Sequence, residues 1–194
     1  ARTLGLGQIT GVDMPGEKEG LIPSSDWKKK NQGEAWYPGE TISVAIGQGP
    51  VLVTPLQVAA LTACLANRGI RVKPRVTRLE GKMGPVKDKT GINPETFEKI
   101  IEGMWRSVND GGTGHGAYQP GFDICGKTGS TQVISREKAE RMIKRGEEPA
   151  KTHSWFTGFA PRYQPQVVVT VLVEFGGMGG QTAAPIAGQM FKLY

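Results

Sequence analysis

The sequence predicts an α/β fold of the α+β type, in which helices flank a small sheet. Two segments have the apolar periodicity and capping residues of helices, and three later segments have the apolar runs of strands. The 194 residues include 28 glycines and 13 prolines, about a fifth of the chain against an average of roughly 12%. So many turn-forming residues argue against a pure helix bundle.

Two helices are marked by their ends and their periodicity. Thr54 and Pro55 supply an N-cap and a first-turn proline, and Gln57 completes a capping box. The segment Leu56–Ala66 that follows is apolar nearly all round, which predicts a central, buried helix. A second helix begins after Asn93 and carries its apolar residues on one face: Phe97, Ile100, Ile101, Met104, Trp105 and Val108.

Three strands are predicted in the second half of the chain, over Phe122–Val133, Ser154–Ala160 and Gln166–Phe175. A charged helix over residues 135–146 interrupts the first two, and the short connection between the last two favours an antiparallel hairpin. The run Val167–Val173 does not alternate, so we expect this strand to be covered on both faces. A final helix is predicted over Ala183–Phe191.

The remaining segments have weaker patterns. Residues 1–50 are glycine-rich with little periodicity, so we expect irregular structure there. Ile70–Leu79 is expected to be extended and Gly81–Thr90 to be a turn region. His115 lies among glycines, which predicts a solvated loop residue, and His153 is expected to be a surface or supporting residue at a strand start.

Composition excludes several classes of protein. The longest apolar runs fall far short of the ~20 residues of a membrane helix. The net charge of +6 permits an anionic partner, but no aromatic residues interleave with the basic ones, so we expect no nucleic-acid binding. Cys64 and Cys125 lie in apolar patterns typical of buried free thiols. With two histidines in the chain, nothing indicates a zinc site, and we expect no metal or cofactor.

The sharpest local feature is the stretch Gly126-Lys127-Thr128-Gly129-Ser130-Thr131-Gln132 inside the first predicted strand. Glycine weakens a strand interior unless a ligand or another backbone must approach closely. A cation beside two hydroxyls on such a strand suits an anionic ligand. A P-loop is excluded because its spacing is absent. By itself the stretch equally fits an exposed polar strand end.

The wider sequence resembles the class B penicillin-binding proteins, and their elongation-type members most closely. The resemblance keeps the family's order and runs nearly end to end, through Leu6–Glu17, Trp36–Thr41, Ile46–Gly49 with Thr54–Gln57, Gly126–Gln132 and Trp155–Pro161. Lys-Thr-Gly is one of the signatures of this family, beside Ser-x-x-Lys and Ser-x-Asn. The implied fold is the C-terminal portion of the transpeptidase domain, over residues 1–194, with the C-terminal helix on one sheet face and the other helices opposite.

The resemblance implies a serine D,D-transpeptidase that cross-links peptidoglycan stem peptides and is acylated by β-lactams. Lys127, Thr128 and Ser130 would bind the substrate carboxylate, with Gly129 between them. The backbone N–H of Ser130 would be an oxyanion-hole donor, which is worth on the order of 3–4 kcal/mol of barrier. Thr131 and Gln132 would continue the edge along which substrate pairs as an added strand.

The nucleophile expected of the family has no counterpart in the expected place. Ser25-x-x-Lys28, Ser135-x-x-Lys138 and Ser107-x-Asn109 match in letters, but their order or their distance from Lys127 is wrong for the family. We expect the true motifs upstream of residue 1, and therefore no acyl-enzyme from this segment alone.

Two alternatives stay open beside the transpeptidase. One is a hydrolase of the D,D-carboxypeptidase or β-lactamase type, and the other is a non-catalytic binding module that lacks the nucleophile. The resemblance further implies a position outside the cytoplasmic membrane, in the periplasm, with an anchor upstream. The implied partners are the rest of the transpeptidase chain and a membrane glycan polymerase of the elongation complex.

Overall fold

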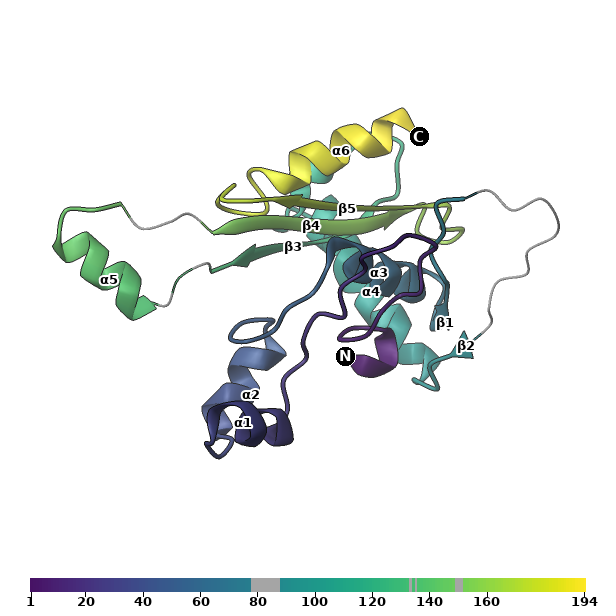
Figure 1. Ribbon diagram of the computed structural model, residues 1–194. Coiled ribbons are helices and arrows are strands. Elements are labelled where there is room, and N and C mark those ends of the chain that lie inside the picture. The colour runs from purple at the N-terminus through teal and green to yellow at the C-terminus, as the bar shows by residue number, and fades with distance from the viewer. Residues whose placement is uncertain (78–87, 133, 135, 149–151) are drawn as a thin grey trace.

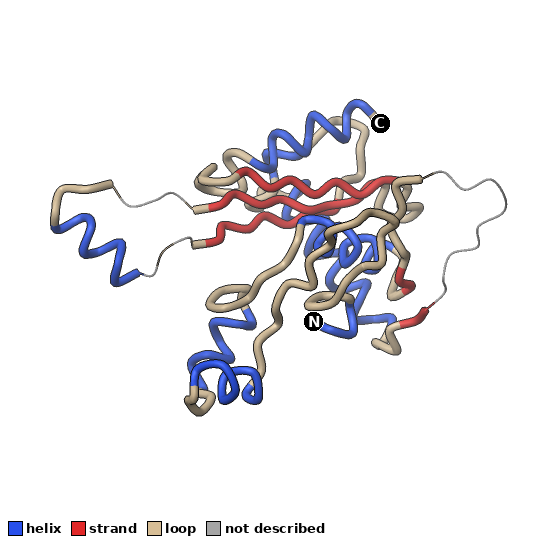
Figure 2. Tube along the Cα trace, viewed as in Figure 1, coloured by secondary structure: helices blue, strands red, loops and turns tan. Residues whose placement is uncertain are grey.

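The computed structural model describes residues 1–77, 88–132, 134, 136–148 and 152–194. Its centre is an antiparallel sheet in the order β3 (Cys125–Thr131), β4 (His153–Ala160) and β5 (Val167–Val173), which Figures 1 and 2 show as three stacked strands. Gly126 is opposite Gly158 in the register, and Phe156 is opposite Val171. The predicted antiparallel hairpin of the last two strands is therefore confirmed.

Helices cover both faces of this sheet. The C-terminal helix α6 (Ala183–Leu193) lies on one face, and α3 (Pro55–Ala66) lies on the other, with α4 (Pro94–Asn109) against β3 (Figure 1). Both α6 and α3 contact β5, so this strand is covered on both sides, as its unbroken apolar run predicts. The expected arrangement of helices is confirmed.

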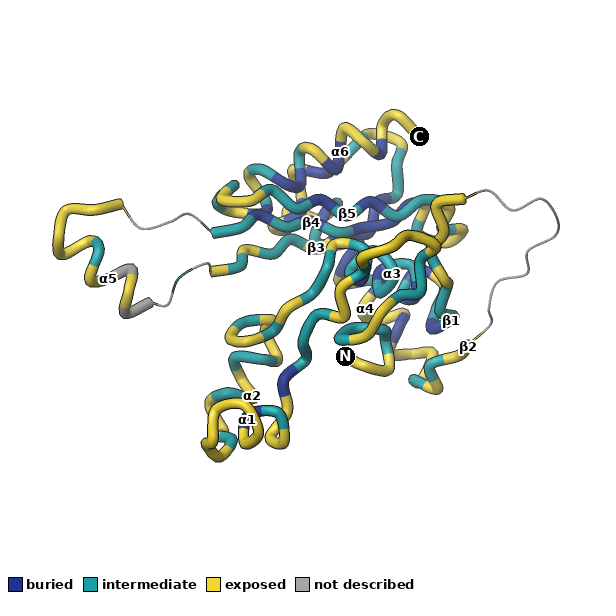
Figure 3. The backbone as a smooth tube through the Cα atoms, viewed as in Figure 1, coloured by how far each residue is buried: buried dark blue, intermediate teal, exposed yellow. Residues whose placement is uncertain are grey.

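The core consists of two apolar clusters, one for each face of the sheet. Phe156 and Phe191 are fully buried in the cluster under α6, and Phe159 and Ile101 are fully buried in the cluster beside α3 and α4. Figure 3 shows the buried segments gathered where the helices meet the sheet. Because α4 contributes to both clusters, it holds β3 from the side and fixes the position of that strand.

The start of α3 also holds the N-terminal segment in place. Thr54 and Gln57 form the predicted capping box, with Gln57 N–H donating to Thr54 Oγ1 at 3.1 Å. The buried Gln57 side chain goes further, because its Nε2 donates to the backbone carbonyls of Gln8 and Glu19, both at 2.7 Å. One amide therefore connects two stretches of chain that have no regular structure of their own.

The expectation of irregular structure throughout residues 1–50 is wrong. Two helices, α1 (Ser25–Gln32) and α2 (Pro38–Ala45), form a lobe that projects from the body (Figure 1). Ser24 caps α1, and Lys28 is almost fully buried between the helices, where its Nζ lies 2.8 Å from Glu40 Oε2. Helix α1 is polar, and neither of these short helices has a marked apolar stripe, so their contacts, not their periodicity, define them.

Several element limits differ from the prediction. Strand β3 begins at Cys125 and not at Phe122, and it ends at Thr131; Val133 lies outside the described residues. Strand β4 begins one residue earlier than predicted, and β5 begins one residue later and ends two residues earlier. The stretch Ile70–Leu79 is a strand only at β1 (Ile70–Arg71), which pairs with β2 (Asp88–Lys89), and residues 78–87 lie outside the description.

Three smaller elements complete the fold. Short 3₁₀ turns occur as η1 (Arg2–Leu4) and η2 (His115–Ala117). The predicted charged helix is α5 (Arg136–Lys144), which Figure 1 shows projecting away from the sheet between β3 and β4. No helix among the described residues has the length and apolar character needed to cross a bilayer.

Candidate carboxylate-binding site

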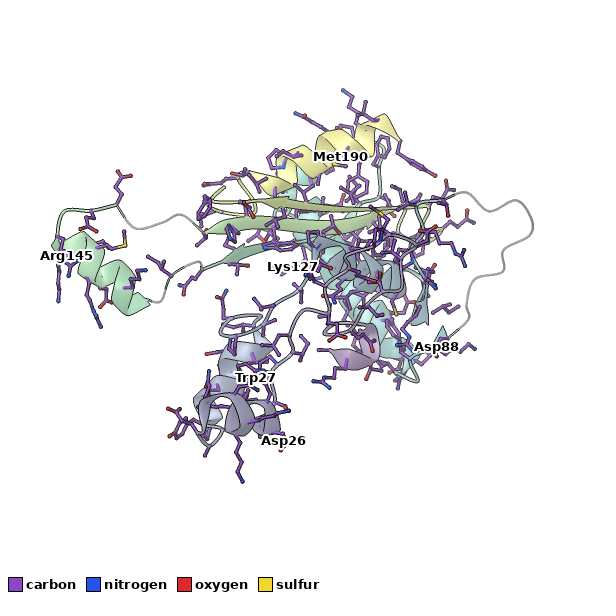
Figure 4. The ribbon with its side chains drawn as sticks, in the orientation of Figure 1. Asp26, Trp27, Asp88, Lys127, Arg145 and Met190 are labelled. Atoms are coloured by element: carbon purple, nitrogen blue, oxygen red, sulfur yellow. The ribbon has the colours of Figure 1, made fainter. Side chains whose placement is uncertain are left out.

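The predicted polar stretch lies on an edge strand. Among the described residues β3 pairs with β4 alone, so its outer side is open. Side chains alternate along the strand: Thr128 points toward the α6 face, where its hydroxyl meets that of Thr113 at 2.8 Å. Lys127 points to the other face, since its partner Thr157 contacts Thr62 of α3. Figure 4 marks Lys127 at the middle of the molecule.

A groove of about 490 Å³ runs beside this strand. Its walls are the β3 residues at 127–130, the turn around His115, and the loop at 178–181 between β5 and α6. Lys127 borders the groove, with its Nζ donating to the Thr128 carbonyl at 2.6 Å, and Thr128 and Ser130 supply hydroxyl groups. This combination of one cation and directed donors is suited to a carboxylate.

The loop at 178–181 fits against β3 because it carries glycine at the point of closest approach. A Cβ on Gly179 would lie 2.5 Å from the carbonyl oxygen of Gly129, which leaves no room for a side chain. The Gly179 N–H donates to Ser130 Oγ at 3.2 Å, and Ser154 Oγ accepts from Ala183 N–H at 3.1 Å. The Ser130 hydroxyl is therefore held by a backbone donor. Another backbone thus approaches β3 at Gly129, but the glycine that this approach requires is Gly179, because a Cβ on Gly129 would meet only the Trp155 side chain, at 3.3 Å.

The two outermost residues of the predicted stretch lie differently. Thr131 is the last residue of β3 and is opposite His153 in the register. Gln132 lies just beyond the strand and is exposed, and its pairing with a substrate stays a prediction. Of the predicted stretch, residues 127–130 line the groove.

The described residues of the three rejected motifs have places or roles of their own. Ser25 begins α1 in the projecting lobe, where the neighbouring Asp26 and Trp27 lie well away from Lys127 (Figure 4). Asn109 Nδ2 donates to the carbonyls of Trp105 and Ile124, which is a structural role at the end of α4. Ser135 lies outside the described residues. None of the described residues in these rejected motifs forms a nucleophile and base beside the groove.

The two histidines lie in different parts of the fold. His153 begins β4, and its Nδ1 accepts the N–H of Phe175 at 3.0 Å, which is the supporting role expected. His115 is exposed, but it lies in η2 and not in a loop, with Nδ1 3.1 Å from the Val108 carbonyl and its ring stacked on Tyr118. The predicted solvent exposure of His115 is confirmed and its predicted place in a loop is wrong; the residue also lines the groove.

Sequence reasoning missed the long-range contacts of the site. Thr113 and Gly179 fix the hydroxyls of Thr128 and Ser130, and the side chain of Gln48 donates to the Ser130 carbonyl at 3.3 Å. Gln48 lies between two glycines in one of the stretches that resemble the family. This resemblance was the sequence feature that could have marked Gln48 as a residue of the site. Nothing local in the sequence links it to β3.

The cysteines are free and buried, as predicted. Burial raises the pKa of the Cys125 thiol to about 12, and burial likewise raises the pKa of Cys64. Such thiols hold their protons at neutral pH and are poor nucleophiles. Over the described residues, no three histidine, cysteine, aspartate or glutamate side chains gather as a metal site would require.

Comparison with known proteins places these features in a family. The penicillin binding protein transpeptidase domain matches residues 1–192. The chain is 40% identical over 202 residues to the peptidoglycan D,D-transpeptidase MrdA of Acinetobacter baumannii, with all of this chain and 30% of that protein covered. It is 32% identical to MrdA of Escherichia coli K12, covering 90% of this chain and 29% of that protein. The chain thus spans about 30% of the length of these relatives.

Solved structures of penicillin-binding proteins have the same fold as this chain. Pseudomonas aeruginosa PBP2 in complex with WCK 5153 superimposes with a TM-score of 0.80 at 34% identity, covering 99% of this chain and 42% of that one. Helicobacter pylori PBP2 in complex with MreC gives 0.74 at 29% identity, covering 99% and 34%. With a family match over nearly every residue and a shared fold around the β3 edge, the chain belongs to the penicillin-binding protein transpeptidase domain family.

Proposed function

We propose that this chain is the carboxylate-binding part of a peptidoglycan D,D-transpeptidase. The observation that supports this most strongly is the open β3 edge, where the exposed Lys127 and the fixed hydroxyls of Thr128 and Ser130 border one groove. The groove has the charge and donors for the terminal carboxylate of a stem peptide. The family match over residues 1–192 supports the reaction class.

In this proposal the chain binds and orients the donor peptide. Lys127 attracts its terminal carboxylate, Thr128 and Ser130 donate hydrogen bonds to that group, and the Ser130 N–H stabilises the oxyanion. A serine Oγ then bonds to the penultimate D-Ala carbonyl carbon, the peptide C–N bond breaks, and the terminal D-Ala leaves with a proton. An amine on a neighbouring peptidoglycan strand next displaces the serine and forms the cross-link.

The serine and its base are proposed to come from a part of the protein outside residues 1–194. The described Ser-x-x-Lys and Ser-x-Asn sequences of this chain have structural roles, and the relatives are about three times as long. Nucleophilic catalysis needs the serine and its base within hydrogen-bond reach of one another. A chain that provides only the binding edge is therefore expected to be inactive alone.

Partners and location are proposed on the same basis. The H. pylori relative was solved with MreC, and another neighbour, 33% identical with a TM-score of 0.77, belongs to a peptidoglycan synthase complex that coordinates polymerization and crosslinking. We infer a glycan polymerase as partner and a position at the outer face of the cytoplasmic membrane. This is where peptidoglycan stem peptides are available.

The test compares residues 1–194 with the longer protein that contains them. Fluorescent penicillin is expected to label the longer protein at one site, and excess unlabelled penicillin should prevent this; residues 1–194 alone should stay unlabelled. A stoichiometric adduct on the short chain would contradict the external nucleophile, and an unlabelled longer protein would contradict the function. Supplying a stem pentapeptide and a free amine then separates the activities, since a transpeptidase forms the new amide and a carboxypeptidase only releases D-Ala.

A further inference from the structure

The outer edge of β3 is covered by two side chains. In an antiparallel pair, backbone groups of alternate residues point away from the partner strand. Thr128 and Ser130 are such residues: the Thr128 carbonyl accepts from Lys127 Nζ at 2.6 Å, and the Ser130 carbonyl accepts from Gln48 Nε2 at 3.3 Å. Both outward carbonyls of the site thus already have a side-chain donor.

Gln48 is aimed at β3 by a tight turn after α2. Its own N–H donates to the Ser43 carbonyl at 2.9 Å, and the preceding N–H of Gly47 donates to Val44 at 3.0 Å. Gly47 and Gly49 both have left-handed backbones, with φ of 75° and 72°, which lets the chain reverse on either side of Gln48. The side chain is half-buried and therefore limited in the directions it can take.

A peptide that binds as an added strand needs the same acceptor. Strand addition works by N–H groups of the ligand donating to outward carbonyls of the edge strand. Since the Ser130 carbonyl lies beside the groove hydroxyls, it is the acceptor next to the bound carboxylate end of such a ligand. The Gln48 bond is long for an amide hydrogen bond, so a ligand N–H can replace it.

We propose that Gln48 is a specificity-determining residue. Its side chain caps the Ser130 carbonyl by a hydrogen bond, and a ligand with an amide N–H replaces that hydrogen bond with its own. The cap also protects an open edge from pairing with other strands, as edge strands require. This inference rests on the proposed function and adds to it a residue that discriminates between ligands with and without an amide N–H beside the reacting carbonyl. Ligands without that N–H leave the cap in place.

The experiment uses the longer protein and two β-lactams that differ at this position. Benzylpenicillin carries a side-chain amide N–H, and imipenem carries a hydroxyethyl group instead. The second-order acylation constants are measured for wild type, Gln48→Ala and Gln48→Met, with Gln32→Ala on the exposed end of α1 as control. Gln48→Met keeps the side-chain length without a donor, and it decides the question if the alanine variant does not fold.

Both Gln48 variants are expected to react about threefold to tenfold faster with benzylpenicillin, the range of one displaced neutral hydrogen bond. Their constants for imipenem should change less than twofold, and Gln32→Ala should match wild type for both. An equal change for the two drugs, no change, or a selective slowing with benzylpenicillin would overturn the role of Gln48. Wild type that reacts with neither drug would instead overturn the proposed function, so the two failures are distinguishable.

Discussion

Gly126 lies against the ring of Phe156, one strand away in the sheet. A Cβ at residue 126 would come within 2.8 Å of the ring carbon Cε2 and closer still to Cζ. Phe156 is fully buried in the cluster under α6, and Gly126 is buried beside it. The absence of a side chain at this position lets the phenylalanine pack directly beneath the strand that carries Lys127.

Gly126→Ala is therefore expected to destabilise the protein by about 1–3 kcal/mol, because overpacking forces the ring or the strand to move. The free energy of unfolding from denaturant titration measures this. Gly103→Ala is the matched control: this glycine lies exposed in the interior of α4 with nothing near its Cβ position, so alanine should stabilise by about 0.5–1 kcal/mol. Equal effects at the two positions would contradict the packing argument.

Gln57→Leu should cost about 2–4 kcal/mol of unfolding free energy. The substitution keeps the size of the buried side chain but leaves the carbonyls of Gln8 and Glu19 without their donor in a partly buried place. Proteolysis is the second measurement, since cleavage within residues 1–22 should accelerate when this segment is released from α3. Gln32→Leu on the surface of α1 should leave both quantities near wild type.

Lys127→Ala, made in the longer protein, is expected to lower the acylation constant for penicillin about 10- to 100-fold, the usual range for a charge-assisted hydrogen bond. The melting temperature should hardly move, because the side chain is exposed. Lys99→Ala on the exposed side of α4 removes the same charge away from the groove and should react like wild type. Unchanged acylation of the Lys127 variant would remove this residue from the site.

The buried Cys125 thiol predicts how the free energy of unfolding changes at high pH. Burial raises the thiol pKa from its ordinary value of 9.0 to about 12, so the native state holds this proton more tightly than the unfolded state does. The resulting stability is fully present below pH 9 and is lost as the pH rises toward 12. Unfolding free energy should therefore fall less between pH 8 and pH 10.5 in Cys125→Ala than in wild type.

The same burial predicts thiol reactivity. At pH 8 a thiol reagent such as Ellman's reagent should leave both cysteines unmodified in the native protein and modify both after unfolding in guanidinium. Rapid modification of the native protein would show that one of the thiols is accessible.

Local sequence signals were sufficient for the central elements. The Thr54–Gln57 capping box and the one-sided apolar stripe of α4 identify their helices, and the run Val167–Val173 identifies a strand covered on both faces. These features depend on neighbours within one or two turns. For the same reason the polar stretch around Lys127 could be recognised as a ligand-binding edge.

The rest depends on contacts between distant parts of the chain. Thr113, Gly179 and Gln48 reach β3 across separations of 15, 49 and 82 residues, and no local pattern marks them. Helix α1 is similarly polar along its whole length, and Lys28 is buried there through its contact with Glu40. Propensity and periodicity do not report such pairings, which is why the lobe was expected to be irregular.

The α5 excursion has a consequence for how the binding strand is aligned. A tight hairpin turn would dictate which residues of β3 and β4 lie opposite one another. Here a long connection that contains α5 joins the two strands, so their register must come from packing. Moving β3 by one position would turn the lysine ammonium toward Phe156 and the apolar layer under α6. The close fit of Gly126 against that ring therefore keeps the lysine on the face of β3 opposite α6.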